Sequence, residues 1–555
     1  MDAWKKFVDE VKSVSGKSHV EQPPKEIDAD LSIPCYGTKP EDVKKLAEQV
    51  KKKLPKKSLI ANVVAVGPYM NFYLNYSLFN DDVMKQILKE KERFGAGAPK
   101  KEKIMVEFCH ANTHKAFHIG HTRNISLGES IARLLEKNGS TVVRANYQGD
   151  VGMHVAKTMW GMLNLKKLGL KEPEKDKGKW LGTVYAKAST AGKDEKIAKE
   201  VNEINQKLYA GDKKLLELWK KTRQWSIDYF EKTIYPDFGV KFDRFYFESQ
   251  VEKKGVEIVK SLLEKGIAKK SEGAVVMDLK KSSLGIFLLL KSDGTPLYST
   301  KDLYLAELEN KEYKPDMILH VVGSEQTLYF RQLIKTFELS NPKIAKKEKH
   351  ISYELVILPT GKMASREGVV VLYDDTLKKL MELAEHEIKK RYKKISDKEL
   401  ELRARQIAIG AVKYSMLSQN PNRTIVFNEQ EVVQFEGDTG PYLQYTHARA
   451  KSILRKSRHA SGTSEFSKLD ENLEKQLIKK LSLFPSVVET AGAQYHPHLI
   501  ATYLNELAAA FNEYYHSIKV IDEPNEPQRL ALVEAVAVVL KNGLWLLGIE
   551  APEKM

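Results

Sequence analysis

The sequence predicts a multidomain α/β protein. A Rossmann-type domain with a parallel sheet, split by an insertion, lies between a small α+β N-terminal domain and an all-α C-terminal domain. Three observations predict this fold class. At ~150 residues per domain, a chain of 555 residues has room for three or four domains. Apolar runs of strand length alternate with helical periodicity in the middle of the chain. From about residue 400 the pattern is helical almost to the end.

The first 97 residues form the predicted N-terminal domain. A Lys-rich segment that includes residues 46–54 has the apolar spacing of an amphipathic helix, and the alternating residues 71–75 predict a strand. Residues 95–99 combine small side chains with a proline that stops regular structure, which is typical of a linker. We therefore place the first domain boundary at residue 97.

The central domain, residues 98–397, has the strand–helix–strand pattern of a parallel sheet. Residues 104–108 are a short apolar run, and a strand begins again at Thr141. Between them, residues 120–137 have helical spacing, with Gly139 where a C-terminal cap belongs. A second unit follows, with a strand at 317–322, a helix at 325–339 and a strand at 353–358. Such alternation implies parallel strands joined by right-handed crossovers.

Two further regions complete the predicted architecture. Residues from about 155 to 285 are Lys-rich and largely helical, and we interpret them as an insertion that splits the doubly wound fold. Residues 398–555 predict an all-α domain, because apolar residues recur at helical spacing, most clearly at 408–417, 504–515 and 530–547.

Composition narrows the class of partner. Lys and Arg number 90 against 74 Asp and Glu, and a net charge of +16 attracts polyanions such as nucleic acid, although it also serves solubility alone. The only cysteines, Cys35 and Cys109, exclude a disulfide framework and a four-thiolate zinc site. No run approaches the ~18 apolar residues of a membrane span. A cytoplasmic location is expected.

His118 and His121 flank Gly120 between a predicted strand and the helix that follows it. A helix start offers unpaired N–H groups and the positive end of the helix dipole, which suit a phosphate. Histidines three residues apart share a helix face and can both donate to a triphosphate, and a glycine between them lets a flat base approach the backbone. The alternative is two unrelated surface histidines. The strand before them and the helix after them favour a nucleotide site.

A second candidate for phosphate binding is the loop 361–368, which follows a predicted strand and Pro359. Glycines at both ends and cations between them suit a mobile loop that closes on pyrophosphate. A plain surface turn is the alternative. The residues expected to contact the nucleotide in this loop are Lys362, Met363, Ser365 and Arg366.

These two elements resemble the HIGH and KMSKS motifs of class I aminoacyl-tRNA synthetases, and residues 107–117 are similar to the arginyl-tRNA synthetase family in particular. The loop departs from the general KMSKS pattern, since Ala364, Ser365 and Arg366 replace its first serine, second lysine and last serine. Arginyl enzymes commonly lack that second lysine and compensate with a lysine three positions before the first HIGH histidine, the position of Lys115. The resemblance implies ATP with Mg²⁺ as a substrate, and as catalytic residues Lys115, His118, His121 and Lys362.

An arginine site requires acidic residues, because carboxylates match the planar, forked donors of a guanidinium. Tyr298 and Asp302 lie four residues apart and would share a helix face. The arginyl family has Tyr and Asp at that spacing in contact with its substrate, and it also uses a Glu, an Asn and a Gln. The matching residues predicted to bind arginine are Glu107, Asn112, Tyr298, Asp302 and Gln326. Each alone could be an ordinary helix-face or cap residue, so the joint match carries the assignment.

Segments outside the catalytic motifs also resemble the arginyl family. Its Gly-Asp-x-Gly element is similar to residues 149–154, its tRNA-elbow domain to 67–72, the entry of its helical anticodon-binding domain to 437–449, and its C-terminus to 546–555. Exposed Tyr442 and Tyr445 would offer faces on which anticodon bases stack, or they are core tyrosines. The residues predicted to contact tRNA are Tyr69, Asn71, Tyr442, Tyr445 and Met555.

The resemblance covers nearly the whole chain and thins within residues 155–285. It implies an arginine–tRNA ligase that acts on L-arginine, ATP and tRNA(Arg), needs bound tRNA for activation, and is a monomer without zinc or membrane association. A class I lysyl enzyme is disfavoured by the guanidinium-pocket residues. A catalytically silent tRNA-binding paralogue would be expected to lose HIGH histidines or pocket carboxylates. A small nucleotidyltransferase would not need the N- and C-terminal domains.

Overall fold

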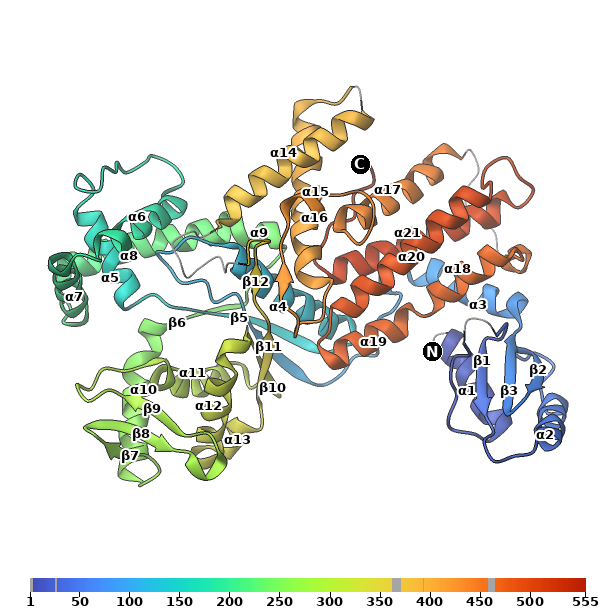
Figure 1. The fold of residues 1–555 in the computed structure, drawn as a ribbon, viewed down its shortest axis with the longest axis horizontal. Coiled ribbons are helices and arrows are strands. Elements are labelled where there is room, and N and C mark those ends of the chain that lie inside the picture. The colour runs from blue at the N-terminus through green and yellow to red at the C-terminus, as the bar shows by residue number, and fades with distance from the viewer. Residues whose placement is uncertain (1–2, 25–26, 362–370, 393, 458–464) are drawn as a thin grey trace.

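The computed structural model describes residues 3–24, 27–361, 371–392, 394–457 and 465–555. Figure 1 shows an elongated molecule, with the N-terminal module in blue at one end and a group of green helices and strands at the other. A parallel sheet and a bundle of orange and red helices lie between these ends. The predicted fold class is confirmed: a split Rossmann-type sheet, a small α+β module and an all-α C-terminal part.

The N-terminal module is a three-stranded antiparallel sheet packed against helices. The strand order is β1–β3–β2, and Gly67, with a φ of 58°, makes the tight turn between β2 and β3. Phe7 and Phe72 are fully buried in its core. The elements are α1 (Ala3–Ser15), β1 (Leu31–Pro34), α2 (Pro40–Lys52), β2 (Ile60–Val66) and β3 (Tyr69–Leu74).

The central sheet has five parallel strands in the order β11–β10–β4–β5–β6. The chain runs from β4 to β5 and β6 on one side, then returns to place β10 and β11 on the other side. The order of the strands therefore reverses between β4 and β10. Their bounds are β4 (Lys103–Glu107), β5 (Thr141–Gln148), β6 (Arg244–Phe247), β10 (Met317–Gly323) and β11 (Glu348–Tyr353).

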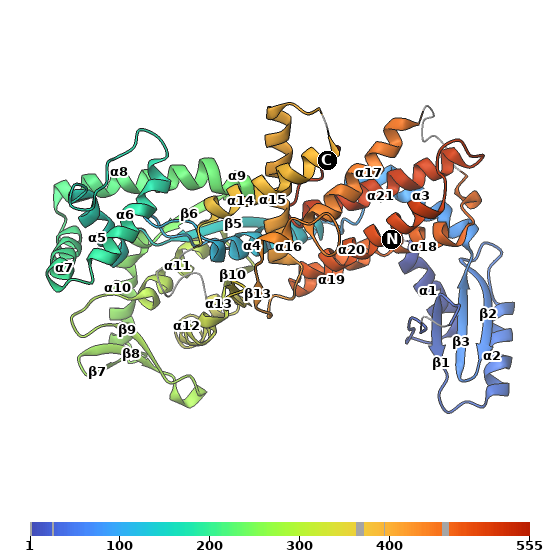
Figure 2. The ribbon, with the colours of Figure 1, turned by 45° about the horizontal axis from the view of Figure 1, so that its top comes forward.

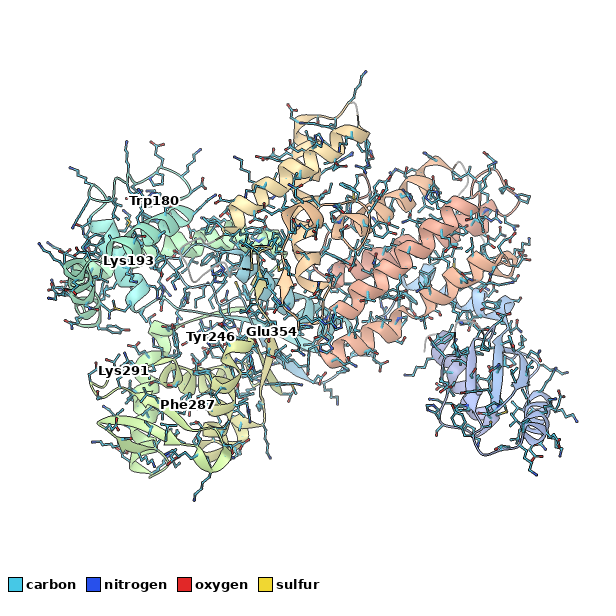
Figure 3. The ribbon with its side chains drawn as sticks, viewed as in Figure 1. Trp180, Lys193, Tyr246, Phe287, Lys291 and Glu354 are labelled. Carbon is cyan, nitrogen blue, oxygen red and sulfur yellow. The ribbon has the colours of Figure 1, made fainter. Side chains whose placement is uncertain are left out.

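Helices cover both faces of this sheet. Helix α4 (Ile119–Lys137) packs on one face, where Gly128 lets it approach closely: a Cβ there would lie 2.2 Å from the Phe108 ring. Helices α10 (Glu248–Glu264) and α11 (Tyr298–Tyr313) pack on the other face with Met105 and Tyr246, the second of which is labelled in Figure 3. The sheet is thus buried on both sides, as parallel sheets generally are.

The structure differs from the prediction at residues 353–358, which do not form the last strand of the sheet. That strand, β11, ends at Tyr353, where the next amide, Glu354 N, donates to Pro421 O at 2.8 Å. The chain then forms β12 (Val356–Ile357), which pairs with β13 (Ile425–Val426) in a separate two-stranded sheet. The hydrogen bond between Glu354 and Pro421 thus lies where the chain leaves the central sheet, although the sequence predicts one strand over residues 353–358.

The predicted insertion is also not uniformly helical. Strand β6 lies within residues 155–285 and pairs with β5, so it belongs to the central sheet. Between β5 and β6 come α5 (Met153–Leu163), α6 (Lys177–Ala191), α7 (Glu195–Tyr209), α8 (Lys213–Tyr229), a π-helical turn (Phe230–Ile234) and α9 (Tyr235–Phe238). After α10 comes an antiparallel sheet of β7 (Lys269–Ser271), β8 (Ala274–Asp278) and β9 (Ile286–Leu290). Figure 2 shows these two groups as separate bodies on either side of the central sheet.

From Asp397 onward the described chain is largely helical, as predicted, with the short strand β13 as an exception. Helix α3 (Tyr76–Glu90) packs against α18 and α21, so the N-terminal module rests on this helical part. Domain boundaries at residues 97 and 397 stay predictions. The helices are α12 (Thr327–Ser340), α13 (Pro342–Ala345), α14 (Tyr373–Arg391), α15 (Asp397–Leu417), α16 (Glu429–Val432), α17 (Gly440–Lys456), α18 (Asn472–Ser482), α19 (Phe484–Gln494), α20 (His498–Ser517) and α21 (Glu526–Leu546).

Candidate active site

A cavity of about 360 Å³ opens at the carboxyl edge of the central sheet, next to the point where the strand order reverses. Open α/β sheets bind ligands at such a switch point, because the loops that leave neighbouring strands there run in opposite directions. The volume is in the range of small-molecule sites. All five residues predicted to bind arginine line this one cavity: Glu107, Asn112, Tyr298, Asp302 and Gln326.

Three segments that are apart in the sequence supply these residues: residues 107–112, helix α11 and the turn that contains Gln326. Glu107 ends β4, and Asn112 lies in the loop that follows it. Asn112 Oδ1 accepts a 3.1 Å hydrogen bond from Gly149 N, and a Cβ on Gly149 would overlap that oxygen at 2.4 Å. Glycine at position 149 is therefore needed to seat the Asn112 amide against the end of β5.

Helix α11 presents Tyr298 and Asp302 to the cavity, as their spacing predicts. Tyr329 of α12 donates a hydrogen bond from its hydroxyl to Asp302 Oδ2. The Tyr329 ring packs edge-on against Phe287 of β9 at 5.5 Å between centroids, and Phe287 is labelled in Figure 3. The small antiparallel sheet thus supports one wall of the cavity through this aromatic pair.

The charge of the Asp302 carboxyl is sensitive to its surroundings. Burial raises its pKa to about 7, with a further contribution from the nearby Glu107 carboxylate, although the Tyr329 hydrogen bond opposes the shift. An empty cavity therefore leaves this carboxyl partly protonated at neutral pH. A cation placed against it would favour the ionised form.

Glu107 is held by a buried histidine of the neighbouring strand. His320 donates from Nδ1 to Glu107 Oε1 at 2.9 Å and from Nε2 to Glu348 Oε2 at 2.5 Å. Burial alone would raise the pKa of Glu107, but the His320 charge and hydrogen bond outweigh it and hold that pKa at about 2. Burial would lower the pKa of His320, but the carboxylates raise it well above its ordinary value. The pair is therefore an imidazolium and a carboxylate.

Several buried carboxyl oxygens around the cavity accept no N–H bond within the described part of the chain. An unsatisfied buried acceptor costs free energy comparable to a lost hydrogen bond, so a ligand with many N–H groups would bind favourably here. Arginine has five guanidinium N–H donors and three on its ammonium group. The oxygens are Glu107 Oε2, Asp302 Oδ1 and Glu348 Oε1.

The two predicted nucleotide histidines lie at the start of α4, with His118 as its N-cap residue. Their rings stack at 3.7 Å between centroids, and His118 N donates to His121 Nδ1 at 3.2 Å. Because Nδ1 of His121 accepts, the proton of the neutral ring is on Nε2. Burial lowers the pKa of His118 to about 4 and that of His121 well below its usual range, with Lys115 adding to both shifts. Both rings are neutral hydrogen-bond donors at pH 7.

Gly120 packs closely against the His118 ring, because a Cβ at this position would lie 3.1 Å from that ring. Lys115 lies on the same loop, with its Nζ 5.4 Å from the centroid of the Tyr185 ring of α6.

The predicted nucleotide contacts of the basic loop lie outside the described residues. They are Lys362, Met363, Ser365 and Arg366. The chain that follows the loop is tied to the histidine turn: Ile119 N donates to Val371 O at 3.1 Å, and Tyr373 N to Phe117 O at 3.0 Å.

The two predicted tRNA contacts of the N-terminal module differ in accessibility. Tyr69 opens β3, and its hydroxyl lies 2.7 Å from that of Tyr36, whose side chain is 70% exposed. Asn71 is buried, and its Oδ1 accepts a 2.7 Å hydrogen bond from Ser32 Oγ. The tyrosine pair therefore forms a surface, whereas the Asn71 side chain stabilises the sheet.

The predicted anticodon contacts are less exposed than expected. Tyr442 and Tyr445 are half-buried, because α17 packs among α15, α20 and α21. The Tyr445 ring lies between two guanidinium groups. Its centroid is 4.8 Å from Arg449 Cζ and 5.7 Å from Arg391 Cζ. Met555 is buried against α14 and α15, and its carbonyl oxygen accepts a hydrogen bond from the Tyr392 hydroxyl. The C-terminus is thus fixed beside the Arg–Tyr cluster.

Sequence reasoning missed the other acidic and histidine residues of the cavity. Glu248 follows β6, and Lys301 donates to its Oε2 at 2.7 Å. Its position directly after a strand could have marked Glu248 as a site residue, but that strand lies within the segment predicted to be a largely helical insertion. His320 was recognisable as a lone histidine in an otherwise apolar strand. The missed polar lining residues are His110, Tyr147, Glu248, Glu309, His320, Tyr329 and Glu348.

The described residues contain neither a metal-binding cluster nor a helix suited to cross a membrane. No group of three or more His, Cys, Asp or Glu side chains is arranged to hold a metal ion in the part of the chain that the structure describes. Over the same residues, no helix combines the length and apolarity that crossing a membrane requires.

The fold and the site together define a class I aminoacyl-tRNA synthetase. The parallel sheet is split, a histidine pair lies at its first helix beside an acid-lined cavity, and a helical domain follows. Family models agree along the chain. The model for tRNA synthetases class I (R), catalytic domain, matches residues 83–428, that for the DALR anticodon binding domain 443–555, and that for the arginyl tRNA synthetase N terminal domain 2–74. The chain belongs to the arginyl-tRNA synthetase family.

Full-length relatives and solved structures agree with this assignment. The arginine–tRNA ligase of Bdellovibrio bacteriovorus is 36% identical over 545 residues, which cover 96% of this chain and 93% of that protein. That of Clostridium acetobutylicum is 34% identical over 546 residues, 97% of this chain and 96% of that protein. The structure of Thermus thermophilus arginyl-tRNA synthetase superposes with a TM-score of 0.81 at 27% identity, covering 100% of this chain and 99% of that one.

Proposed function

We propose that this enzyme is an arginine–tRNA ligase. It uses ATP to activate L-arginine as arginyl-adenylate and transfers the arginyl group to the 3′-terminal ribose of tRNA(Arg), with release of AMP and pyrophosphate. The observation that carries the proposal is the single acid-lined cavity in which Glu107, Asn112, Tyr298, Asp302 and Gln326 meet. The names of the relatives support the same activity. A silent paralogue is disfavoured, because the histidine pair and the carboxylates are all present.

Arginine would bind through its two cationic ends. Asp302, with Tyr298 on the same helix, would accept from the guanidinium, because a carboxylate matches that planar fork. Glu107 and Asn112 lie closer to the histidine turn along the chain, and with Gln326 they would orient the amino acid end. Binding at both ends places the substrate carboxylate for attack and removes much of the entropic cost of the reaction.

Activation would proceed at the start of α4. The arginine carboxylate attacks the α-phosphorus of ATP, an oxygen–phosphorus bond forms, and the bond to pyrophosphate breaks. His118 and His121, as neutral donors, and Lys115, as a cation, would stabilise the charge that develops on the phosphates. Gly120 would lie under the adenine. Lys362 and Arg366 of the basic loop, with Met363 and Ser365, stay predicted nucleotide contacts.

Transfer would follow on the same enzyme. The 2′-hydroxyl of the terminal ribose attacks the carbonyl carbon of the adenylate, and AMP leaves. The N-terminal Tyr69 surface and the cluster of Tyr442 and Tyr445 beside Met555 would contact the tRNA, and Asn71 stays a predicted contact. Magnesium bound to ATP, a monomeric state and a cytoplasmic location are part of this proposal. The two cysteines, both free and buried, are compatible with a reducing compartment.

A charging assay tests the function. Purified enzyme is incubated with ATP, tRNA(Arg) transcript and labelled arginine, with labelled lysine and a lysine tRNA transcript as matched controls. Esterification of arginine to tRNA(Arg) alone is the expected result. Binding of tRNA(Arg) without charging by any amino acid would instead identify a silent paralogue.

The protonation of Asp302 predicts a pH dependence of arginine binding. With a pKa of about 7 in the empty cavity, the carboxyl is mostly neutral at pH 6 and mostly ionised at pH 8. Arginine binds the ionised form, so its affinity should rise about tenfold from pH 6 to pH 8, with proton release on binding below pH 7. Titration calorimetry in buffers of different ionisation enthalpy measures both. An affinity that falls or stays level over this range would contradict the assignment.

A further inference from the structure

A chain of buried ionic hydrogen bonds crosses three neighbouring strands beneath the cavity. It runs from Glu107 on β4 through His320 on β10 to Glu348 on β11. In the sheet register His320 lies directly opposite Glu107, so the strand pairing brings the two side chains onto the same face. Their exposed fractions are 3% for Glu107, 5% for His320 and 9% for Glu348.

The orientation of the His320 ring is fixed from several sides. Each ring nitrogen donates to a different carboxylate, so neither is free to turn toward another partner. Phe330 of α12 packs on the ring at 5.2 Å between centroids, with an interplanar angle of 34°. Phe330 also stacks on His350, at 4.5 Å, and thereby closes this side of the network. A buried ion with both donors satisfied and a packed ring has a single arrangement.

The fixed His320 ring in turn restrains Glu107, which is the residue of this hydrogen-bonded series that the proposed function assigns to arginine. One of its oxygens is committed to His320, and its Oε2 accepts no N–H bond within the described residues. Glu309 of α11 lies beside it, and burial together with the Glu107 charge raises the pKa of Glu309 well above its usual value. The neutral Glu309 and the cationic His320 therefore confine the Glu107 carboxylate on two sides.

We propose that His320 is a positioning residue of the active site: as an imidazolium shared between Glu107 and Glu348, it keeps Glu107 ionised and oriented to accept an N–H group of arginine. Glu348 is the second anchor of the ring. The inference rests on the proposed function, because it assigns Glu107 to the arginine substrate. Without the His320 charge the carboxyls at this face would be buried without a compensating cation, and burial would then favour protonation of Glu107.

The titratable groups that face His320 come from β4, the loop after it, α11 and β11, whereas α12 contributes the apolar Phe330 ring. They are Glu107 of β4, His110 of the loop that follows, Asp302 and Glu309 of α11, and Glu348 and His350 of β11. Of these, Asp302 already titrates near neutral pH. A His320→Asn enzyme should therefore have two carboxyls, Asp302 and Glu107, that must ionise for arginine to bind, where the natural enzyme has one.

The experiment compares His320→Asn with His350→Asn, which also removes a ring stacked on Phe330 but leaves the ionic chain intact. Charging of tRNA(Arg) is measured with arginine varied and with ATP varied, from pH 6 to pH 8. For His320→Asn we expect KM for arginine to rise at least about tenfold at pH 7, with KM for ATP within about twofold. Below pH 7 the logarithm of kcat/KM for arginine should rise with a slope near 2, against about 1 for the natural enzyme and for His350→Asn.

An unchanged KM for arginine together with an unchanged pH slope in His320→Asn would overturn the proposal. Should that variant fail to fold, Glu348→Gln keeps the shape of the site and removes the second anchor. It is expected to raise KM for arginine several-fold with its melting temperature preserved, and a natural KM in Glu348→Gln would equally overturn the proposal. Failure of the natural enzyme to charge arginine at any pH would instead refute the proposed function, so the two failures are distinguishable.

Discussion

Replacing Asp302 by asparagine is expected to lower kcat/KM for arginine by about 10²- to 10³-fold. The substitution keeps the size of the side chain and its bond to Tyr329. It removes the charge that the proposed function places opposite the guanidinium, and it adds a donor that would face the donors of the substrate. Truncating one partner of a buried charge pair costs ~2–5 kcal/mol, and each 1.4 kcal/mol corresponds to tenfold. Steady-state charging with arginine varied at saturating ATP and tRNA measures the effect.

Glu312→Gln is the matched control for this variant. It removes a carboxylate from the same helix, but Glu312 lies near the surface, where it pairs with Arg244 at 3.0 Å and does not line the cavity. Its kcat/KM for arginine should stay within about twofold of the natural value, because partly exposed ion pairs contribute little. Two results would show that the guanidinium binds elsewhere. One is an unchanged kcat/KM for arginine in Asp302→Asn, and the other is an equal loss of kcat/KM for arginine and for ATP.

The second large effect is expected at the histidine pair. His118→Asn and His121→Asn should each lower kcat about 10²- to 10³-fold, because removing one preorganised donor from a developing charge costs ~2.7–4 kcal/mol. Asparagine is a favourable N-cap residue, so at position 118 it preserves the start of α4 while it removes the imidazole. Single-turnover formation of arginyl-adenylate with saturating substrates isolates this chemical step.

The same variants provide their own control through the other substrate. KM for arginine and the melting temperature should stay near the natural values, because neither imidazole lines the arginine cavity. A variant that activates arginine at the full rate would remove these histidines from the catalytic machinery. A variant that melts early would show that the stacked pair stabilises α4 more than it stabilises the transition state.

Local pattern was sufficient for elements whose neighbours in sequence are also neighbours in space. The strand at β4, the helix α4 and the start of β5 follow one another and pack together, so their periodicity predicted them correctly. The failures came where distant contacts decide the structure. Residues 353–358 leave the sheet because Glu354 bonds to Pro421, and β6 joins β5 across the helices that separate them.

The residues of the candidate site also fall into those that sequence could predict and those that depend on contacts between distant segments. Glu107 and Asn112 could be placed because their segment, next to the histidine pair, resembles the arginyl family. Tyr298 and Asp302 could be placed because that family has Tyr and Asp at the same spacing, which is about one helical turn. His320 is 213 residues from Glu107, and only the strand order, with β10 beside β4, brings them within hydrogen-bond distance. The sequence does not show which strands are neighbours. It also could not show that α17 would half-bury Tyr442 and Tyr445 among other helices.

ATP–pyrophosphate exchange with and without tRNA(Arg) tests the central claim most directly, with lysine in place of arginine as the control. The proposed function, with the tRNA requirement of the family, predicts exchange with arginine in the presence of tRNA(Arg) and none with lysine. Absence of exchange with any amino acid, in a protein that binds tRNA(Arg), would contradict the claim that this cavity activates arginine.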